Sequence, residues 1–405
     1  MKFSTVLLLL ITLSISACSK WDSDPRQARN EQAERATGDI VVGVVWPTQG
    51  PKIDLWEGID IASQEINAAG GVLGRKLRIV KADDQSSLAK GRLVAQEFAD
   101  NRDMVAVIGH LYSFIALPAS SIYQAAGLVY ITPGATAHRI NTQGFDLVFR
   151  SIASNRNLGI QLADYMASQG HKRVAVLYEK TTNTQVLANY FEQRARELGI
   201  TIVDRRRYQQ GSEDFSVQIS AWKDLYAFDA IFLAARLQEG SAFITQARRL
   251  GLNHPIVSGE GLDTPDILAN KDAQGVAVPE EISGLGKQRE PYKRFVALYQ
   301  KVHGRVPGTY PVVGYDSVHL LAHAMRKANN AVPDKVSLAL HATQGWQGAA
   351  GEYTFDDIGD LPNKKIGIKK VQDGRFVDLT CGQGMPCAAS TPNPPSASTA
   401  LPRTP

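Results

Sequence analysis

The sequence GLVYITPGATAHRI, residues 127–140, joins the pattern of a buried strand to a loop of small polar residues. The apolar run Leu128–Ile131 has the length of a strand that is covered on both faces. In the loop TPGAT that follows, Gly134 and Ala135 have little side chain to shield their N–H groups, and Thr136 adds a hydroxyl. Such a loop is suited to a small, polar and anionic ligand, although a plain strand-to-helix turn has the same composition.

Strand and helix patterns alternate along most of the chain. A first series has strands over 40–45, 77–82, 105–108 and 128–131, and helices over 55–68, 88–98 and 114–126. A second series has strands over 174–177, 201–208 and 230–233, and helices over 186–198 and 215–225. Alternating strands and helices predict parallel sheets with helices on both faces, so the fold class is α/β with two doubly wound lobes. Later helical patterns over 291–302 and 314–328, and short strand-like pieces after Gly351, could complete both lobes by crossing between them.

Ligands of open α/β sheets gather at the carboxyl ends of strands, next to helix N-termini. Ser113 follows such a strand within VIGHLYSF, residues 107–114, where its hydroxyl could cap the next helix or face a ligand. No G-x-S-x-G, H-E-x-x-H, P-loop or G-x-G-x-x-G after the first strand occurs. His319 and His323 have metal-like spacing on a predicted helix but are interpreted as ordinary buried or surface histidines. The sequence therefore predicts a protein that binds a ligand and closes around it, with no catalytic residues, cofactor or metal.

The first residues are typical of an export signal. Lys2 is followed by the apolar stretch Val6–Ile15, which is too short to span a bilayer stably. Small residues directly before Cys18 resemble a bacterial lipobox, so residues 1–17 are predicted to be a lipoprotein signal peptide and Cys18 the lipidated first residue. An ordinary signal peptide with an incidental cysteine is the alternative.

The rest of the chain is predicted to be exported and soluble. The polar residues 18–38 are expected to form a tether, and the Pro/Ser/Thr-rich residues 381–405 a disordered tail. Cys381 and Cys387 enclose a short flexible loop, and a local disulfide is the favoured interpretation in an oxidising compartment. The formal net charge of +4 is too mild to indicate nucleic-acid binding. We expect a monomer held at the bacterial envelope by a lipid.

Several segments together resemble the periplasmic branched-chain amino-acid-binding family that serves ABC importers. They are IVVGVVWPTQGP (40–51), EINAAGGVLGRKLRIVKADDQSS (65–87), VIGHLYS (107–113), ALPASSIYQAAGLVYITPGAT (116–136) and VSGEGLDT (257–264), in that order. The resemblance implies a periplasmic binding protein of type I, whose two lobes are joined by a three-segment hinge and clamp a ligand. It places lobe 1 at 39–153 and 282–344, and lobe 2 at 154–281 and 345–380.

The resemblance also implies roles for individual residues. Ser113 and Thr136 would contact the carboxylate and ammonium of an α-amino acid, with help from the backbone of Gly134-Ala135. Glu260 of the second lobe would hold the ammonium. Tyr310 matches an aromatic residue that flanks the ligand's side chain.

Three departures from the family pattern bear on the ligand. The loop after Gly50-Pro51 is short and lacks the family's aromatic residue, for which Trp56 is a possible substitute. The frequent Tyr-Gly of the second lobe is Asn183-Thr184, and the frequent Gly-Tyr at the end of the strand near 230–234 is Ala235-Arg236. These changes put leucine, isoleucine and valine in doubt as ligands.

Arg236 suggests a ligand with a second acidic or polar group, because a buried arginine needs an anion. Pairing with Glu239 or Glu260, or exposure to solvent, is the competing interpretation. The main functional hypothesis is a solute-binding lipoprotein that delivers a small amino acid or related carboxylate to an ABC permease. The alternative is an envelope lipoprotein that reuses the fold to regulate cell-wall synthesis or signalling. Ser19 motivates it, because a serine after the lipidated cysteine usually directs proteobacterial lipoproteins to the outer membrane.

Overall fold

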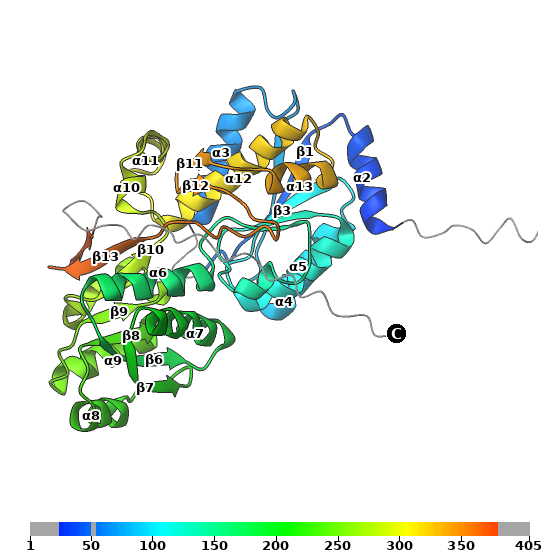
Figure 1. Ribbon diagram of the computed structural model, residues 1–405. Helices are drawn as coiled ribbons and strands as arrows, with labels where there is room; N and C mark the ends of the chain where they lie inside the picture. Colours follow the sequence, from blue (N-terminus) through cyan, green and yellow to red (C-terminus); the bar gives the residue numbers. More distant parts are fainter. Residues whose placement is uncertain (1–23, 50–53, 380–405) are drawn as a thin grey trace, which may run out of the picture.

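The computed structural model describes residues 24–49 and 54–379, which form two α/β lobes (Figure 1). Lobe 1 contains a five-stranded parallel sheet in the order β2-β1-β3-β4-β5. Its strands are β1 (Ile40–Val45), β2 (Leu77–Ala82), β3 (Met104–Gly109), β4 (Val129–Thr132) and β5 (Val148–Arg150). Lobe 2 contains a seven-stranded sheet in the order β14-β13-β10-β9-β8-β6-β7. Its strands are β6 (Arg173–Glu179), β7 (Thr201–Tyr208), β8 (Ala230–Ala234), β9 (Ile256–Ser258), β10 (Ala277–Glu280), β13 (Gly367–Gln372) and β14 (Arg375–Asp378).

Alternate residues of the buried strands pack against helices on opposite faces, as the period of two requires. In lobe 1, α3 (Leu55–Ala68), α12 (Thr309–Ala328) and α13 (Pro333–His341) pack on one face, and α4 (Leu88–Asp100) and α5 (Ser113–Ala126) on the other. In lobe 2, α6 (Asn155–Ser168) and α7 (Thr182–Glu197) cover one face, and α8 (Ser216–Leu225) and α9 (Leu237–Arg249) the other. A further helix, α11, spans Glu290–His303. The shorter elements are α10 (Gly284–Lys287), η1 (His138–Ile140), η2 (Glu260–Leu262), η3 (Pro265–Ala269), η4 (Lys271–Ala273), β11 (Trp346–Gly348) and β12 (Gly351–Tyr353).

The predicted α/β class with two parallel-sheet lobes is confirmed, with one difference in lobe 2. Strands β6 to β10 are parallel, but β13 pairs antiparallel with β10, and β14 antiparallel with β13. Strands β13 and β14 come from the C-terminal part of the chain and extend the parallel sheet at its β10 edge (Figure 1). A two-residue turn at Asp373-Gly374, in which both residues have a positive φ, joins these strands as a tight hairpin requires.

The chain crosses between the lobes three times, at residues 151–154, 281–283 and 354–366. The third crossing comes later than the expected boundary at residue 345. Tyr353, Phe355 and Leu361 belong to the apolar core of lobe 1, and Ile366 and Ile368 pack against that of lobe 2. Residues 345–353 therefore stay with lobe 1, and the first part of the third crossing, as far as Leu361, packs against the core of the same lobe.

A buried carboxylate brings the three crossings together. Glu281, in the second crossing, accepts a hydrogen bond of 3.0 Å from the backbone N–H of Ala153 in the first. Its Oε1 lies 3.8 Å from Nζ of Lys364 in the third, whose side chain is 1% exposed. Burial raises the pKa of Glu281 to about 7, although Lys364 and the Ala153 N–H oppose that shift.

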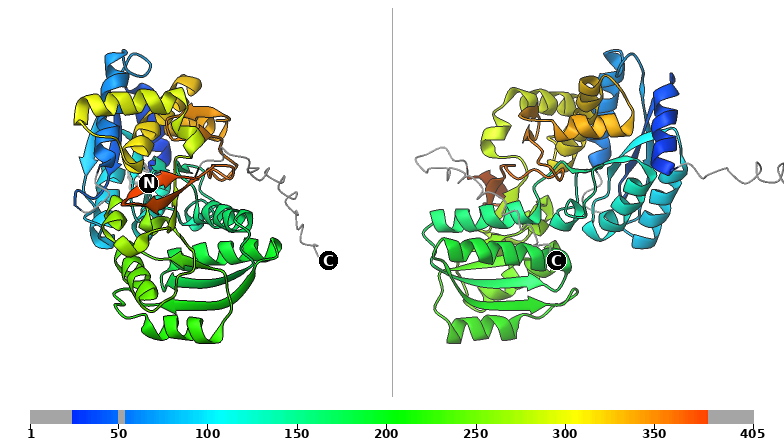
Figure 2. Two further views of the ribbon diagram at one scale, coloured as in Figure 1. Left: turned by 90° about the vertical axis from the view of Figure 1, so that its left-hand side faces the viewer. Right: turned by 45° about the vertical axis from the view of Figure 1, so that its right-hand side comes forward.

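Part of the expected tether is folded. Residues Pro25–Arg35 form helix α2, which begins with proline and is capped by Asp24, whose side chain accepts from the N–H of Arg26. Figure 2 shows α2, in dark blue, along the outer side of lobe 1, where it contacts α5 and α13. The prediction of a polar tether over residues 18–38 is therefore wrong for this stretch.

Arg29 explains why a helix of such polar composition docks. Its side chain is fully buried and donates to the carbonyls of Ala99, Asn101, Met104 and Ala126, at 2.5–2.7 Å. These carbonyls lie at or next to the ends of α4 and α5 and at the start of β3, and those at the helix ends have no partner within their own helices. Burial lowers the pKa of Arg29 to about 10. This value is still well above neutral pH, so the guanidinium stays charged there.

Within the described residues, no helix combines the length and the apolar character needed to cross a bilayer. The predicted signal peptide, the lipidated Cys18, the pair Cys381 and Cys387 and the C-terminal tail lie outside the described residues.

Candidate functional site between the lobes

Polar residues from both lobes meet where the parallel strands end. We call the group Ser113, Thr136, Asn155, Asn183 and Glu260 the interlobe site. Ser113 and Thr136 follow β3 and β4 of lobe 1, Asn155 begins α6 directly after the first crossing, and Asn183 and Glu260 follow β6 and β9 of lobe 2. Carboxyl ends of parallel strands share one edge of a sheet, so two sheets that face each other by these edges bring such residues together.

Thr136 contacts two residues of lobe 2. Its hydroxyl lies 3.3 Å from Oε1 of Glu260, and it accepts a hydrogen bond of 3.2 Å from the Asn183 amide. The same amide lies 3.5 Å from Oε1 of Glu260. The structure thus brings together Thr136 and Glu260, the two residues that the family resemblance placed on opposite sides of the ligand's head group.

Asn155 extends this group and was not predicted from the sequence. Its Nδ2 donates to Oδ1 of Asn183 at 2.5 Å and to the Asn183 carbonyl at 3.1 Å. The side chain is fully buried, and its Oδ1 has no hydrogen-bond partner among the described residues. A buried acceptor without a partner is costly, so a donor such as an ammonium group would be favoured there.

We call residues 132–137, at the end of β4, the ligand loop. Ser113 binds the backbone of this loop rather than capping its own helix. Its Oγ accepts a hydrogen bond of 3.1 Å from the N–H of Ala137, and the N-cap position of α5 is Tyr112, which makes no side-chain cap. The hydroxyl of Ser113 can therefore still donate its proton to an anionic group.

The small residues of the loop serve packing. A Cβ on Gly134 would lie 2.5 Å from Cη2 of Trp46 and 2.9 Å from Cα of Leu111, so no side chain fits there. Ala135 is fully buried, and its N–H donates to Oγ1 of Thr132 at 3.1 Å. This donor is therefore used within the loop, and the expected help from the backbone of Gly134-Ala135 stays a prediction.

Two aromatic rings meet beside this loop. Trp46, directly after β1, is fully buried, and its ring lies 5.4 Å from that of Tyr310 at an angle of 51°. Tyr310 stands in the first turn of α12, next to Thr309, whose hydroxyl lies 3.4 Å from Oδ2 of Asp263 in lobe 2. Trp56 packs against the lobe 1 core on α3, and its ring lies 5.4 Å from Nζ of Lys81.

The charge of Arg236 is already compensated. Its Nε lies 3.2 Å from Oε2 of Glu179, the fully buried last residue of β6. Burial raises the pKa of Glu179, and the charge of Arg236 opposes that shift. This partner is neither Glu239 nor Glu260, the two that the sequence suggested. The Arg236 side chain is also 48% exposed, so its proposed contact with a second acidic or polar group of the ligand stays a prediction.

The chain was compared with known proteins and structures. A family model for periplasmic binding proteins matches residues 39–375. An amino acid binding protein of Pseudomonas aeruginosa is 28% identical over 339 residues, which cover 80% of this chain and 88% of that protein. A leucine-, isoleucine-, valine-, threonine- and alanine-binding protein of the same species is 27% identical over 333 residues, which cover 81% and 88%.

Two solved structures extend the comparison. An ABC transporter substrate-binding protein from Desulfitobacterium hafniense in complex with Leu is 38% identical, covers 84% of this chain and 100% of that chain, and has a TM-score of 0.76. A leucine-binding protein from Thermotoga maritima is 26% identical, covers 84% and 97%, and also has a TM-score of 0.76.

Proposed function

Because the chain belongs to the periplasmic binding protein family, we propose that it captures a small amino acid or related carboxylate between its lobes for an ABC-type importer. The observation that carries the proposal is the meeting of Thr136 with Glu260 across the lobes. A hydroxyl can donate to a carboxylate, and the Glu260 carboxylate can accept from an ammonium. A ligand with both groups would bind only when the two lobes face each other.

Chemistry within the site favours a zwitterionic head group. Glu260 supplies a negative charge, Asn155 an unpaired acceptor, and Ser113 a hydroxyl proton. Tyr310, whose ring packs against the buried Trp46, supplies an aromatic surface for the ligand's side chain. The Leu complex of the 38% identical relative supports an amino acid as the ligand class.

The N-terminal sequence and the family support an exported, lipid-anchored protein. We propose that residues 1–17 are removed and that Cys18 carries the lipid that holds the protein at the envelope, with Cys381 and Cys387 joined as a disulfide. Mass spectrometry of the mature protein tests the cleavage, the lipid and the disulfide. An acylated N-terminal Cys18 is the expected result, and a chain that begins elsewhere would contradict it.

A thermal-melting screen over amino acids and small carboxylates tests the proposed function. A ligand at a hundredfold excess over Kd stabilises the folded state by about 2.7 kcal/mol. For domains of this size, that corresponds to a rise of several degrees in Tm at roughly 2–4 °C per kcal/mol. A panel that leaves Tm unchanged in ligand-free protein would instead support the alternative of an envelope regulator, which needs no small ligand.

A further inference from the structure

Arg150 is a fully buried arginine whose side chain donates to the loop that carries Thr136. It ends β5, directly before the first crossing between the lobes. Its Nη1 donates to the carbonyl of Ala135 at 2.6 Å, and its Nη2 donates to the carbonyl of Ala137 at 3.1 Å. The two carbonyls that flank Thr136 are thus held by one planar group.

These contacts determine which way the neighbouring N–H group points. In a trans peptide, the carbonyl oxygen and the following N–H point in opposite directions. Because the Ala135 carbonyl points to Arg150, the N–H of Thr136 points away from it, and no acceptor for this N–H is found among the described residues. The carbonyl of Thr136 itself accepts from the N–H of Asn155 at 2.8 Å. Three successive carbonyls are therefore fixed, the N–H of Thr136 stays available, and its hydroxyl faces Glu260 of the other lobe.

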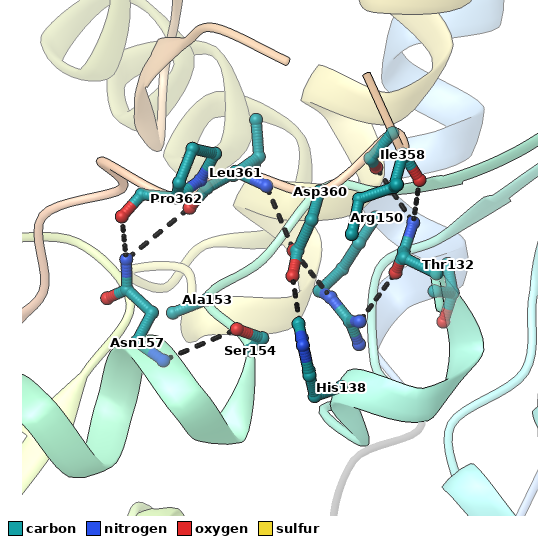
Figure 3. A network of polar contacts seen from close by, with 12 residues as sticks. Thr132, His138, Arg150, Ala153, Ser154, Asn157, Ile358, Asp360, Leu361 and Pro362 are labelled. Carbon is teal, nitrogen blue, oxygen red and sulfur yellow. Dashed lines mark hydrogen bonds and ion pairs between the residues drawn. The ribbon is translucent and has the colours of Figure 1, made fainter. Parts of the chain in front are cut away.

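The counter-charge of Arg150 comes from the third crossing. Oδ1 of Asp360 accepts from Nε of Arg150 at 3.0 Å, and Oδ2 of Asp360 lies 3.4 Å from Nδ1 of His138. Burial by itself would raise the pKa of Asp360, but the charge of Arg150, the nearby His138 and the hydrogen bond from the Leu361 N–H hold it well below its usual range. Figure 3 shows Asp360 between Arg150 and His138, the residue that begins η1 at the end of the loop.

A second tie joins the same elements. The carbonyl of Gly359 accepts from the N–H of Arg150 at 3.0 Å and from Nδ2 of Asn141 at 2.9 Å. Oδ1 of Asn141 in turn accepts from Nη2 of Arg150 at 2.5 Å. The loop, the end of β5 and the third crossing therefore form one hydrogen-bonded unit at the point where the chain leaves lobe 1.

We propose that Arg150 is the positioning residue of the ligand loop and that Asp360 is the counter-charge it requires. The pair holds Thr136 with its hydroxyl and N–H directed to the ligand before the ligand arrives, so that binding does not have to order the loop. This inference rests on the proposed function, since it assigns a role in the same site. Lysine in place of Arg150 would keep the charge near Asp360 but could not hold both carbonyls, because it lacks the planar fork.

The test combines two measurements on Arg150→Lys, Asp360→Asn and the native protein. Calorimetry with the amino acid that raises Tm most is expected to show at least about a tenfold weaker Kd in each variant, the effect of about 1.4 kcal/mol of lost interaction. Hydrogen exchange in the ligand-free proteins is expected to be faster for residues 132–140 and unchanged over β1 and β3. Arg194→Lys is the matched control, because Arg194 lies 2.8 Å from Asp164 on lobe 2 and touches no residue of the interlobe site.

The results separate a positioning role from a purely structural one. A Kd within twofold of native in both variants, or exchange that rises equally throughout lobe 1, would overturn the inference. Should Arg150→Lys fail to fold, Asp360→Asn decides the question by the same two measurements. A native protein that binds no member of the panel contradicts the proposed function, whereas the exchange comparison still tests the role of Arg150.

Discussion

The hydroxyl of Thr136 lies 3.3 Å from the carboxylate of Glu260, although the two residues are 124 positions apart and belong to different lobes. Each stands at the carboxyl end of a parallel strand, where the sheet leaves polar groups without strand partners. A ligand that contacts both residues therefore senses the relative position of the lobes, and its affinity depends on hinge closure.

Glu260→Gln is expected to weaken ligand binding more than Ser113→Ala. Removal of the carboxylate leaves the ligand's ammonium without its counter-charge, at a cost of roughly 3–5 kcal/mol. A lost hydrogen bond from Ser113 to a charged group costs about 1.5–3 kcal/mol. Calorimetry measures both, with Glu197→Gln on the exposed side of α7 as control. The reverse order of effects would mean that the ligand lies in another orientation.

Asn183→Ala should weaken binding by about fivefold to tenfold, as expected for the loss of about 1 kcal/mol of hydrogen bonding. Asn183 bonds Thr136 and Asn155, so its loss loosens both neighbours of the ligand. Titration of the variant beside Asn189→Ala provides the measurement, because Asn189 lies on the same helix but bonds only Arg205 in lobe 2. Equal affinities for the two variants would exclude Asn183 from the ligand's surroundings.

Glu281 should make the stability of the protein depend on pH. Its pKa of about 7 in the folded protein exceeds the ordinary value of 4.5, so the folded state binds more protons than the unfolded state between these two values. Stability contributed by this group is therefore complete below about pH 4.5 and is lost as the pH rises towards 7.

Replacement of Glu281 by glutamine removes this titration. The stability of Glu281→Gln relative to native should increase by about 1–3 kcal/mol between pH 5 and pH 8. Urea unfolding at several pH values measures the difference. A difference that stays constant over this range would show that Glu281 is ionised throughout.

Arg29→Met should destabilise the protein by about 2–4 kcal/mol, because four backbone carbonyls lose their donor. The variant should also release α2 from lobe 1, which makes Pro25–Arg35 sensitive to protease. Arg35→Met is the matched control on the same helix, since Arg35 is exposed and, among the described residues, pairs with Glu31 one turn away. Comparable melting and proteolysis of the two variants would rule out a docking role for Arg29.

Much of the architecture could be predicted from the sequence because the central strands are continuous apolar runs. The bounds of β1, β2 and α3 agree with the predicted ranges 40–45, 77–82 and 55–68. Short elements were missed, as β5 has only three residues and gives no periodic signal. Helix α2 was missed because its composition is polar throughout. Its docking depends on Arg29, whose partners lie 70–97 positions away in the sequence.

The interlobe site was only partly predictable. Thr136 was indicated by the small polar loop after its strand, and Glu260 was predicted only through resemblance to the family, which carries spatial information that periodicity lacks. Asn155 has the sequence signature of an ordinary residue in the first turn of a helix, and its contact with Asn183 depends on how the lobes meet. Arg150 and Asp360 are 210 positions apart, and no local pattern indicates that they pair.

The docking of α2 has a consequence for the mechanics of delivery. Only residues 19–23 separate Cys18 from Asp24, and six extended residues span about 20 Å at most. A lipid on Cys18 would therefore hold lobe 1 close to the bilayer, since α2 is part of that lobe. Lobe 2 would then be the moving arm, and each opening of the hinge would swing it relative to a base that the membrane keeps in place.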